Sequence, residues 1–196
     1  MRRAVLLVAL AAAGCASAPP VFPTEVTRFR ADEVPRGTIS LVPEDGTNDG
    51  PSFQAYAAAV GDALTAQGYT VAAPGADSVL VARIGFQSDT RSVRGPAPFT
   101  LGLGVGGGSY GRGGGVDAGV SGGIPIGKGE LRDDTAATLS VRINRRAGDL
   151  GVWEGKAQTR LIRRTGTGEA NAIPAKLAKA LFTGFPGESG RTITVK

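Results

Sequence analysis

The chain has 196 residues, 41% of them apolar and 20% charged, which is the composition of a globular protein of one domain. Histidine is absent and cysteine occurs once, so histidine catalysis, histidine metal sites and a disulfide within the chain are excluded. Lysine and arginine outnumber aspartate and glutamate by 22 to 17, but no aromatic residues are interleaved with them, and we do not expect nucleic-acid binding.

Residues 1–14 are predicted to be a signal peptide. Arg2 and Arg3 precede an apolar run over 4–13, which is far shorter than the roughly 20 residues of a membrane-spanning helix. The run leads through Ala12-Ala13-Gly14 to Cys15, the sole cysteine. This segment resembles the lipobox of bacterial lipoproteins, whose cysteine thiol takes diacylglycerol and becomes the new N-terminus. The sequence therefore predicts Cys15 as a lipidation site, carrying acyl chains such as palmitate.

One departure from the lipobox leaves an alternative open. Ala12 stands where the usual pattern has leucine, so the segment also fits an ordinary secretion signal with Cys15 incidental. Ala16 follows the cysteine where aspartate would resemble an inner-membrane retention signal. We therefore predict an outer-membrane anchor facing the periplasm, with 15–24 as the lipidated N-terminus and proline-rich spacer.

Residues 25–196 are predicted to form a single periplasmic domain, which begins with strands over 25–30 and 37–42. A helix follows, with Ser52 as its N-cap and Gly68 in the left-handed conformation after its end. Its apolar positions recur at helical spacing and define one buried face. These positions are Phe53, Tyr56, Ala57, Val60 and Leu64.

The second half of the domain reads as strands and one more helix. A strand or turn starts at 69–72, and a strand is expected over 77–86. The alternating segments 138–146 and 152–162 predict a β-hairpin, and a helix over 173–183 and a strand over 191–196 complete the chain. The predicted fold class is α+β, with a mixed or antiparallel sheet and two main helices packed on it.

A glycine-rich insertion over 95–129 interrupts this pattern, with 15 glycines in 35 residues. Apolar residues alternate with glycine on both sides of its centre, which predicts a β-hairpin over 99–127 or a mobile loop. The strand lengths also fit membrane-spanning β-strands. Glycine at every fourth position would suit closely packed transmembrane helices, but Arg112, Asp117 and Pro125 oppose an apolar helix.

Candidate chemical motifs fail on their context. The segment 102–107 matches G-x-G-x-x-G and 122–128 matches G-x-x-x-x-G-K, but no helix is expected to follow either of them. Asp133 and Asp134 could pair as acid and base, but they are expected in a polar turn before a strand. We therefore predict no catalytic, cofactor or metal residues and do not expect an enzyme. A Ser–Lys site, which no local pattern marks, stays open.

Residues from about 28 to 186 resemble a family of bacterial envelope lipoproteins labelled "domain of unknown function 4136". The resemblance rests on Leu64-Thr65-Ala66-Gln67-Gly68-Tyr69, Val152-Trp153-Glu154-Gly155 and Phe185-Pro186 in this order. It implies a lipid-anchored α+β domain, and it brings no catalytic residues. Trp153 and Phe185 are best interpreted as core anchors.

The predicted function is that of an outer-membrane lipoprotein whose domain binds or scaffolds another envelope component, either a protein or a glycan. The membrane is the expected partner of the N-terminal lipid, and no cofactor is expected. The alternative is an oligomeric outer-membrane pore or secretion component in which the hairpin 99–127 inserts into the membrane.

Overall fold

The computed structural model describes residues 22–46, 49–95, 99–103, 122–165 and 172–196. The strands are β1 (Thr24–Arg30), β2 (Thr38–Pro43), β3 (Thr70–Val71), β4 (Leu80–Arg94), β5 (Phe99–Leu103), β6 (Gly122–Ile126), β7 (Leu131–Arg145), β8 (Gly151–Arg164) and β9 (Thr192–Val195). The helices are α1 (Pro51–Ala66), the short 3-10 turn η1 (Ala147–Asp149) and α2 (Ala172–Phe182).

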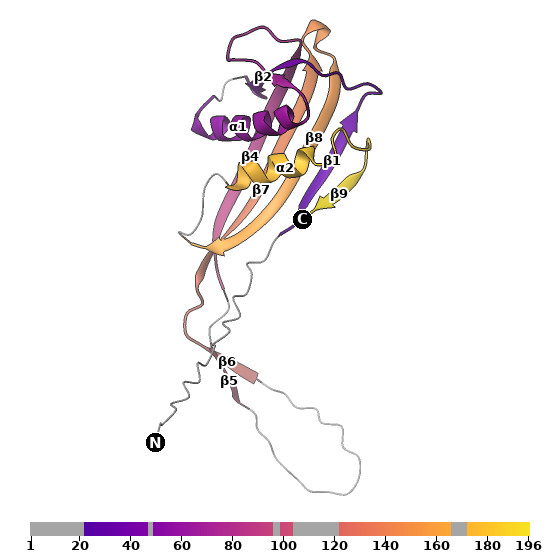
Figure 1. The fold of residues 1–196 in the computed structure, drawn as a ribbon. Coiled ribbons are helices and arrows are strands. Elements are labelled where there is room, and N and C mark those ends of the chain that lie inside the picture. The colour runs from indigo at the N-terminus through magenta and orange to yellow at the C-terminus, as the bar shows by residue number, and fades with distance from the viewer. Residues whose placement is uncertain (1–21, 47–48, 96–98, 104–121, 166–171) are drawn as a thin grey trace, which may run out of the picture.

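Seven strands form one mixed sheet in the order β3-β2-β4-β7-β8-β1-β9. β2 runs parallel to β3 and β4, because α1 carries the chain back before β3 begins, and the other pairs are antiparallel. Both helices lie on the same face of the sheet (Figure 1), with α1 packed over β2 and β4 and α2 over β7, β8 and β1. The predicted α+β class, with a mixed sheet and two helices, is confirmed.

The core lies between this sheet face and the two helices. On β7 the predicted inward residues Leu139, Val141 and Ile143 are buried. Trp153 of β8 is buried as predicted, and its ring stacks on that of Phe182 with the centroids 5.4 Å apart. Phe185 is partly buried and packs against Trp153 at 5.2 Å, so its predicted role as a core anchor is confirmed as well.

Helix α1 buries its predicted apolar face, but its first residue differs from the prediction. The helix begins at Pro51 with Gly50 at the N-cap, and no side chain caps it, so the assignment of Ser52 as N-cap was wrong. Proline suits the first helical position because its fixed φ matches the helix and its missing N–H would be unpaired there anyway. Gly68 adopts φ +88° as predicted.

Three strands are longer than predicted. β4 continues to Arg94, β7 already begins at Leu131, and β8 continues to Arg164, so together they project beyond the two helices (Figure 1). We call this projecting part the extension: residues 88–94, 131–137 and 160–164. Asp133 and Asp134 therefore lie within β7, and their predicted place in a polar turn was wrong.

Polar bonds between neighbouring strands hold the extension together. The hydroxyls of Thr90 and Thr135 are hydrogen-bonded at 2.9 Å, and the hydroxyl of Ser92 donates to Asp133 at 2.9 Å. Such cross-strand pairs stabilise a sheet that has no helix above it.

The glycine-rich insertion is described only near its two ends. β5 and β6 pair antiparallel, with Phe99 opposite Ile126, and form a separate two-stranded sheet beyond the extension (Figure 1). Residues 104–121 lie outside the described residues, so the hairpin 99–127 as a whole stays a prediction. In the part of the chain that the structure describes, no helix is long and apolar enough to span a membrane.

Candidate functional site

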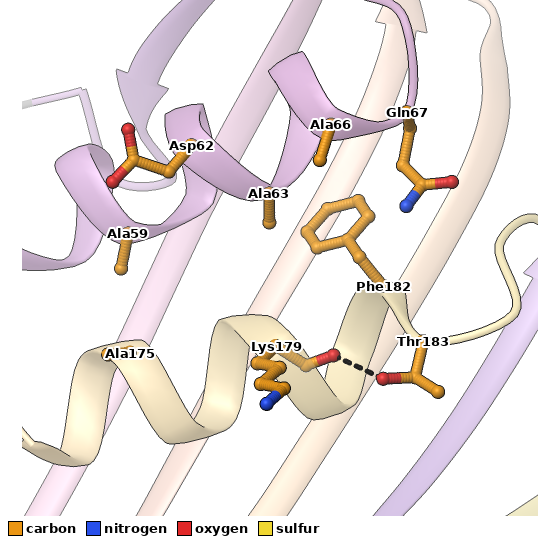
Figure 2. A pocket seen from close by; sticks show the side chains of 9 residues that line it. All are labelled: Ala59, Asp62, Ala63, Ala66, Gln67, Ala175, Lys179, Phe182 and Thr183. Carbon is orange, nitrogen blue, oxygen red and sulfur yellow. Dashed lines mark hydrogen bonds between the residues drawn. The ribbon is translucent and has the colours of Figure 1, made fainter.

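A groove of about 380 Å³ lies between α1 and α2 and is the first candidate site (Figure 2). Its α1 wall carries Ala59, Ala63 and Ala66, and Ala175 lies on the α2 side. Methyl side chains are too short to fill the space between two helices, so the groove follows directly from this run of alanines. The sequence predicted each helix separately. The groove could not be predicted from it, because the groove forms only where the two helices lie side by side.

The groove has an aromatic end and charged rims. Phe182 lines it and is held in place by its stacking on Trp153, whose indole N–H donates to the carbonyl of Pro186 at 3.0 Å. Asp62 on α1 and Lys179 on α2 contribute opposite charges (Figure 2). An apolar surface between two charged rims is typical of binding surfaces for small apolar groups or short peptide segments.

Four polar side chains line this groove: Asp62, Gln67, Lys179 and Thr183. The hydroxyl of Thr183 donates to the carbonyl oxygen of Lys179 at 2.7 Å, so it is engaged with its own helix (Figure 2). The remaining groups are the carboxylate of Asp62, the amine of Lys179 and the amide of Gln67. They can hold a ligand by charge and hydrogen bonds.

A second hollow, of about 760 Å³, lies between the other side of α1 and the β2–β3 edge of the sheet. Asp49, Asp62 and Asp77 line it together with Arg146. The guanidinium of Arg146 donates to the carbonyl of Ser78 at 2.8 Å and to the hydroxyl of the same residue at 2.9 Å, so it fixes the loop before β4.

Arg28 of β1 is a buried cation that the sequence analysis missed. Its guanidinium donates to the carbonyls of Ala180, Leu181 and Thr183 at 3.1, 2.9 and 2.8 Å, at the C-terminal end of α2. A positive charge is favourable there because the last helical carbonyls point outward and carry partial negative charge. Burial lowers the pKa of this guanidinium.

The position of Arg28 gave one usable signal. Thr24, Val26 and Arg28 are every second residue of β1 and therefore lie on one face of the strand. Because Thr24 and Val26 are buried, this period already placed Arg28 on the inward face. Gly187, at φ +80°, passes close above it, and a Cβ there would lie 2.7 Å from Nη1 of Arg28. The loop after α2 therefore closes over the guanidinium only because residue 187 is glycine.

Asp134 and Arg160 form an ion pair across β7 and β8, on the sheet face opposite the helices. Nε of Arg160 donates to Oδ1 of Asp134 at 2.7 Å, and Nη2 contacts Oδ2. The hydrogen bond from Arg160 holds the pKa of the buried Asp134 carboxyl below its ordinary value, and the charges of Arg160 and Arg91 act in the same direction. The pair therefore joins β7 to β8 within the extension.

The predicted lipidation site, Cys15, lies outside the described residues. Among the described residues no group of three acidic, cysteine or histidine side chains is placed to hold a metal ion. The candidate acid pair is also separated: Asp133 accepts hydrogen bonds from Ser92 and Thr165, whereas Asp134 binds Arg160.

Comparison with known proteins gives a matching family model, a relative that aligns over part of its length, and solved structures of low similarity. The family model described as "Domain of unknown function (DUF4136)" matches residues 29–187. An uncharacterized protein from Zymomonas mobilis is 34% identical over 82 residues, which is 41% of this chain and 30% of that relative, so the chain spans less than a third of the relative's length.

Two solved structures align with this chain at low similarity. A PDZ domain protein from Parabacteroides distasonis aligns with a TM-score of 0.46 and 11% identity, over 88% of this chain and 39% of that one. A PelC dodecamer from Paraburkholderia phytofirmans aligns with a TM-score of 0.43 and 10% identity, over 82% of this chain and 95% of that one.

Proposed function

This chain belongs to the DUF4136 family, and on that premise we propose that it is an outer-membrane lipoprotein. In this proposal acyl chains on Cys15 anchor the protein, and its periplasmic domain binds or scaffolds another envelope component. The proposal includes no catalytic role.

One observation carries the anchor: the sole cysteine stands directly after a short apolar run that follows two arginines. A lone thiol at such a position has no disulfide partner within the chain, and lipidation is the chemistry that uses it. One acyl chain binds a membrane reversibly, whereas several make the attachment stable. A tether of this kind raises the concentration of the domain at the membrane surface, which favours even weak binding to a second envelope component.

The position of β1 supports a definite orientation. Thr24 pairs with Thr159 and Arg30 with Trp153, so the chain before Thr24 leaves the sheet in the direction in which β8 continues toward Arg164. Eight residues lie between Cys15 and Thr24, and the nine Cα-to-Cα steps can span at most about 30 Å. An anchored domain would therefore direct its extension toward the membrane.

The groove between α1 and α2 supports the binding role. It combines the methyl groups of alanines, which lie over the buried ring of Phe182, with the charges of Asp62 and Lys179, which is suited to a short peptide or the nonpolar face of a glycan. The groove lies on the face of the sheet that the helices cover. The tip of the sheet is at the end of the extension (Figure 1), and the tether would hold this tip near the membrane.

The anchor is tested by the intact mass of the protein extracted from membranes. We expect a chain that begins at an acylated Cys15, and we expect the Cys15→Ala variant to be lost from the membrane fraction. Ser17→Ala, two residues away, is the matched control and should stay membrane-bound. An unmodified mature chain recovered in the soluble periplasm would overturn the proposal.

A pore remains the second candidate because β5 and β6 pair antiparallel and expose Phe99 and Leu101. A pore would require oligomers that persist in mild detergent, with residues 99–127 protected from protease in intact membranes. A monomer that is cleaved in this segment would exclude it.

A further inference from the structure

Large apolar side chains gather at the end of the molecule that the extension forms. Eight such side chains are exposed among the described residues, and five of them lie here. Val93 and Leu131 stand at the ends of β4 and β7, and the other three lie on the β5–β6 pair: Phe99, Leu101 and Ile126. All five are exposed and lie away from the two helices, so they contribute nothing to the core of the domain.

Basic side chains surround these apolar ones. Arg94 is paired in register with Leu131, and Arg132 with Val93, so a cation stands opposite each of the two apolar residues on β4 and β7. Register partners share a face, so the two pairs lie on the two opposite faces of the tip. Arg94, Lys128 and Arg132 are exposed and form no ion pair with the described carboxylates. Interleaved apolar and cationic groups are characteristic of surfaces that lie in the headgroup region of an anionic membrane.

The distances along the chain allow this contact. β8 continues five residues past Thr159, the partner of Thr24, so the sheet tip lies about 17 Å beyond the start of β1. The eight residues between Cys15 and Thr24, which are nine Cα-to-Cα steps, can reach at most about 30 Å. An acylated Cys15 and the sheet tip can therefore lie at one membrane surface.

We propose that the tip formed by Val93, Arg94, Leu131 and Arg132 docks on the anionic phospholipid surface of the membrane that holds the anchor. The β5–β6 pair, which follows directly in the chain, adds Phe99 and Ile126 to this contact. The inference rests on the proposed lipid anchor. It adds a second, weaker attachment point, which fixes the orientation of the domain where the lipid alone would leave it free to swing.

The experiment uses the full acylated chain reconstituted into phosphatidylcholine vesicles with and without phosphatidylglycerol. A fluorophore is attached to Leu131→Cys, or to the control Leu150→Cys in the turn that follows the other end of β7. Both leucines are exposed, and roughly 45 Å of strand separates the two ends. Quenching by a lipid that carries a nitroxide in its headgroup then reports how close each label is to the membrane surface.

We expect the label at residue 131 to be quenched at least several-fold more than the label at residue 150, only in vesicles that contain phosphatidylglycerol, and less at high salt. The double variant Arg94→Ser/Arg132→Ser should lose this quenching. Arg142→Ser/Arg145→Ser, which removes the same charge near the other end of the sheet, should retain it. Circular dichroism of each variant confirms that the fold is intact.

Three outcomes would overturn the docking proposal. These are equal quenching at both labels, quenching that is independent of phosphatidylglycerol, and self-quenching between labels at residue 131 without lipid quenching, which would assign the tip to contact between two copies. Failure of the anchor itself is visible separately: acylation consumes the thiol of Cys15, so a wild-type chain that takes up the label has no anchor.

Discussion

Arg28 shows how a single side chain joins the first strand to the second helix. It is only 4% exposed, and its three hydrogen bonds all go to carbonyls at the end of α2. Removing it would leave these carbonyls buried without their donor and the space of the side chain empty.

We expect Arg28→Ala to lower the free energy of unfolding by about 2–4 kcal/mol, because hydrogen bonds to a charged group and buried packing are lost together. Arg30→Ala is the matched control: Arg30 lies two residues along the same strand but is exposed, and its loss should cost less than about 1 kcal/mol. Urea unfolding of both variants measures the difference. Equal effects would show that the buried guanidinium adds nothing specific.

The Asp134–Arg160 pair predicts how stability depends on acid. The pKa of Asp134 is lower in the folded protein than the ordinary value near 3.9, so the folded state binds this proton less readily than the unfolded chain. Its contribution to stability is therefore complete above about pH 4 and is lost as the pH falls through the folded pKa.

Asp134→Asn should reduce stability at pH 7 and flatten the decline of stability below about pH 4. Urea unfolding at a series of pH values measures both effects. Asp89→Asn, which removes a carboxylate from the same face of neighbouring β4, is the control and should keep the acid-side decline. If both variants follow the wild type in acid, Asp134 is not the source of that decline.

Two glycines of the α1 region distinguish two effects of adding a side chain: backbone strain at Gly68 and steric contact with a neighbour at Gly61. Gly68 follows α1 with φ +88°, where a side chain is strained by about 1–2 kcal/mol. Gly61 lies within the helix, where alanine is favoured by about 1 kcal/mol, and its added Cβ would lie 3.3 Å from Cδ1 of Leu41, a side chain that can shift.

We therefore expect Gly68→Ala to destabilise the protein by about 1–2 kcal/mol and Gly61→Ala to change its stability by less than about 1 kcal/mol. Thermal and urea unfolding of the two variants distinguish them. If Gly61→Ala were the more harmful change, packing against β2 would matter more than the backbone conformation at the helix end.

The elements of the body could be predicted because each has one buried face. α1, β7 and β8 carry apolar residues at the helical or strand period, since the sheet and helices cover that face. The extension could not be predicted in this way. Around Thr90 and Asp133 no helix covers the sheet, both faces carry polar residues, and the apolar alternation that marks a strand disappears.

The candidate site was harder to predict than the fold. The alanines of α1 and Ala175 of α2 are far apart in the sequence, and a groove between them exists only once both helices lie on the sheet. The burial of Arg28 was missed because arginine is rarely fully buried, and the carbonyls that it caps lie more than 150 residues later. Cys15, by contrast, could be proposed as a lipidation site from the sequence, because the residues that mark such a site directly precede it in the chain.

At the scale of the whole molecule, the proposed anchor and the sheet tip belong to one arrangement. The chain enters β1 at the end of the sheet from which the extension projects, and the exposed apolar side chains of Val93 and Leu131 lie at the tip of that extension. The net excess of basic residues then has a local meaning: near the tip, cations stand beside apolar groups, as a membrane surface requires.

The place of β1 in the sheet also affects when the protein can fold. Thr24 pairs with Thr159 and with Val195, so the first strand has no partner until nearly the whole chain has been synthesised. Contacts this distant in sequence form slowly, because a long loop must close before they contribute. A chain that is exported as we propose would thus stay unfolded long enough to be threaded across the inner membrane. Its sheet would close only on the far side, when β8 and β9 arrive.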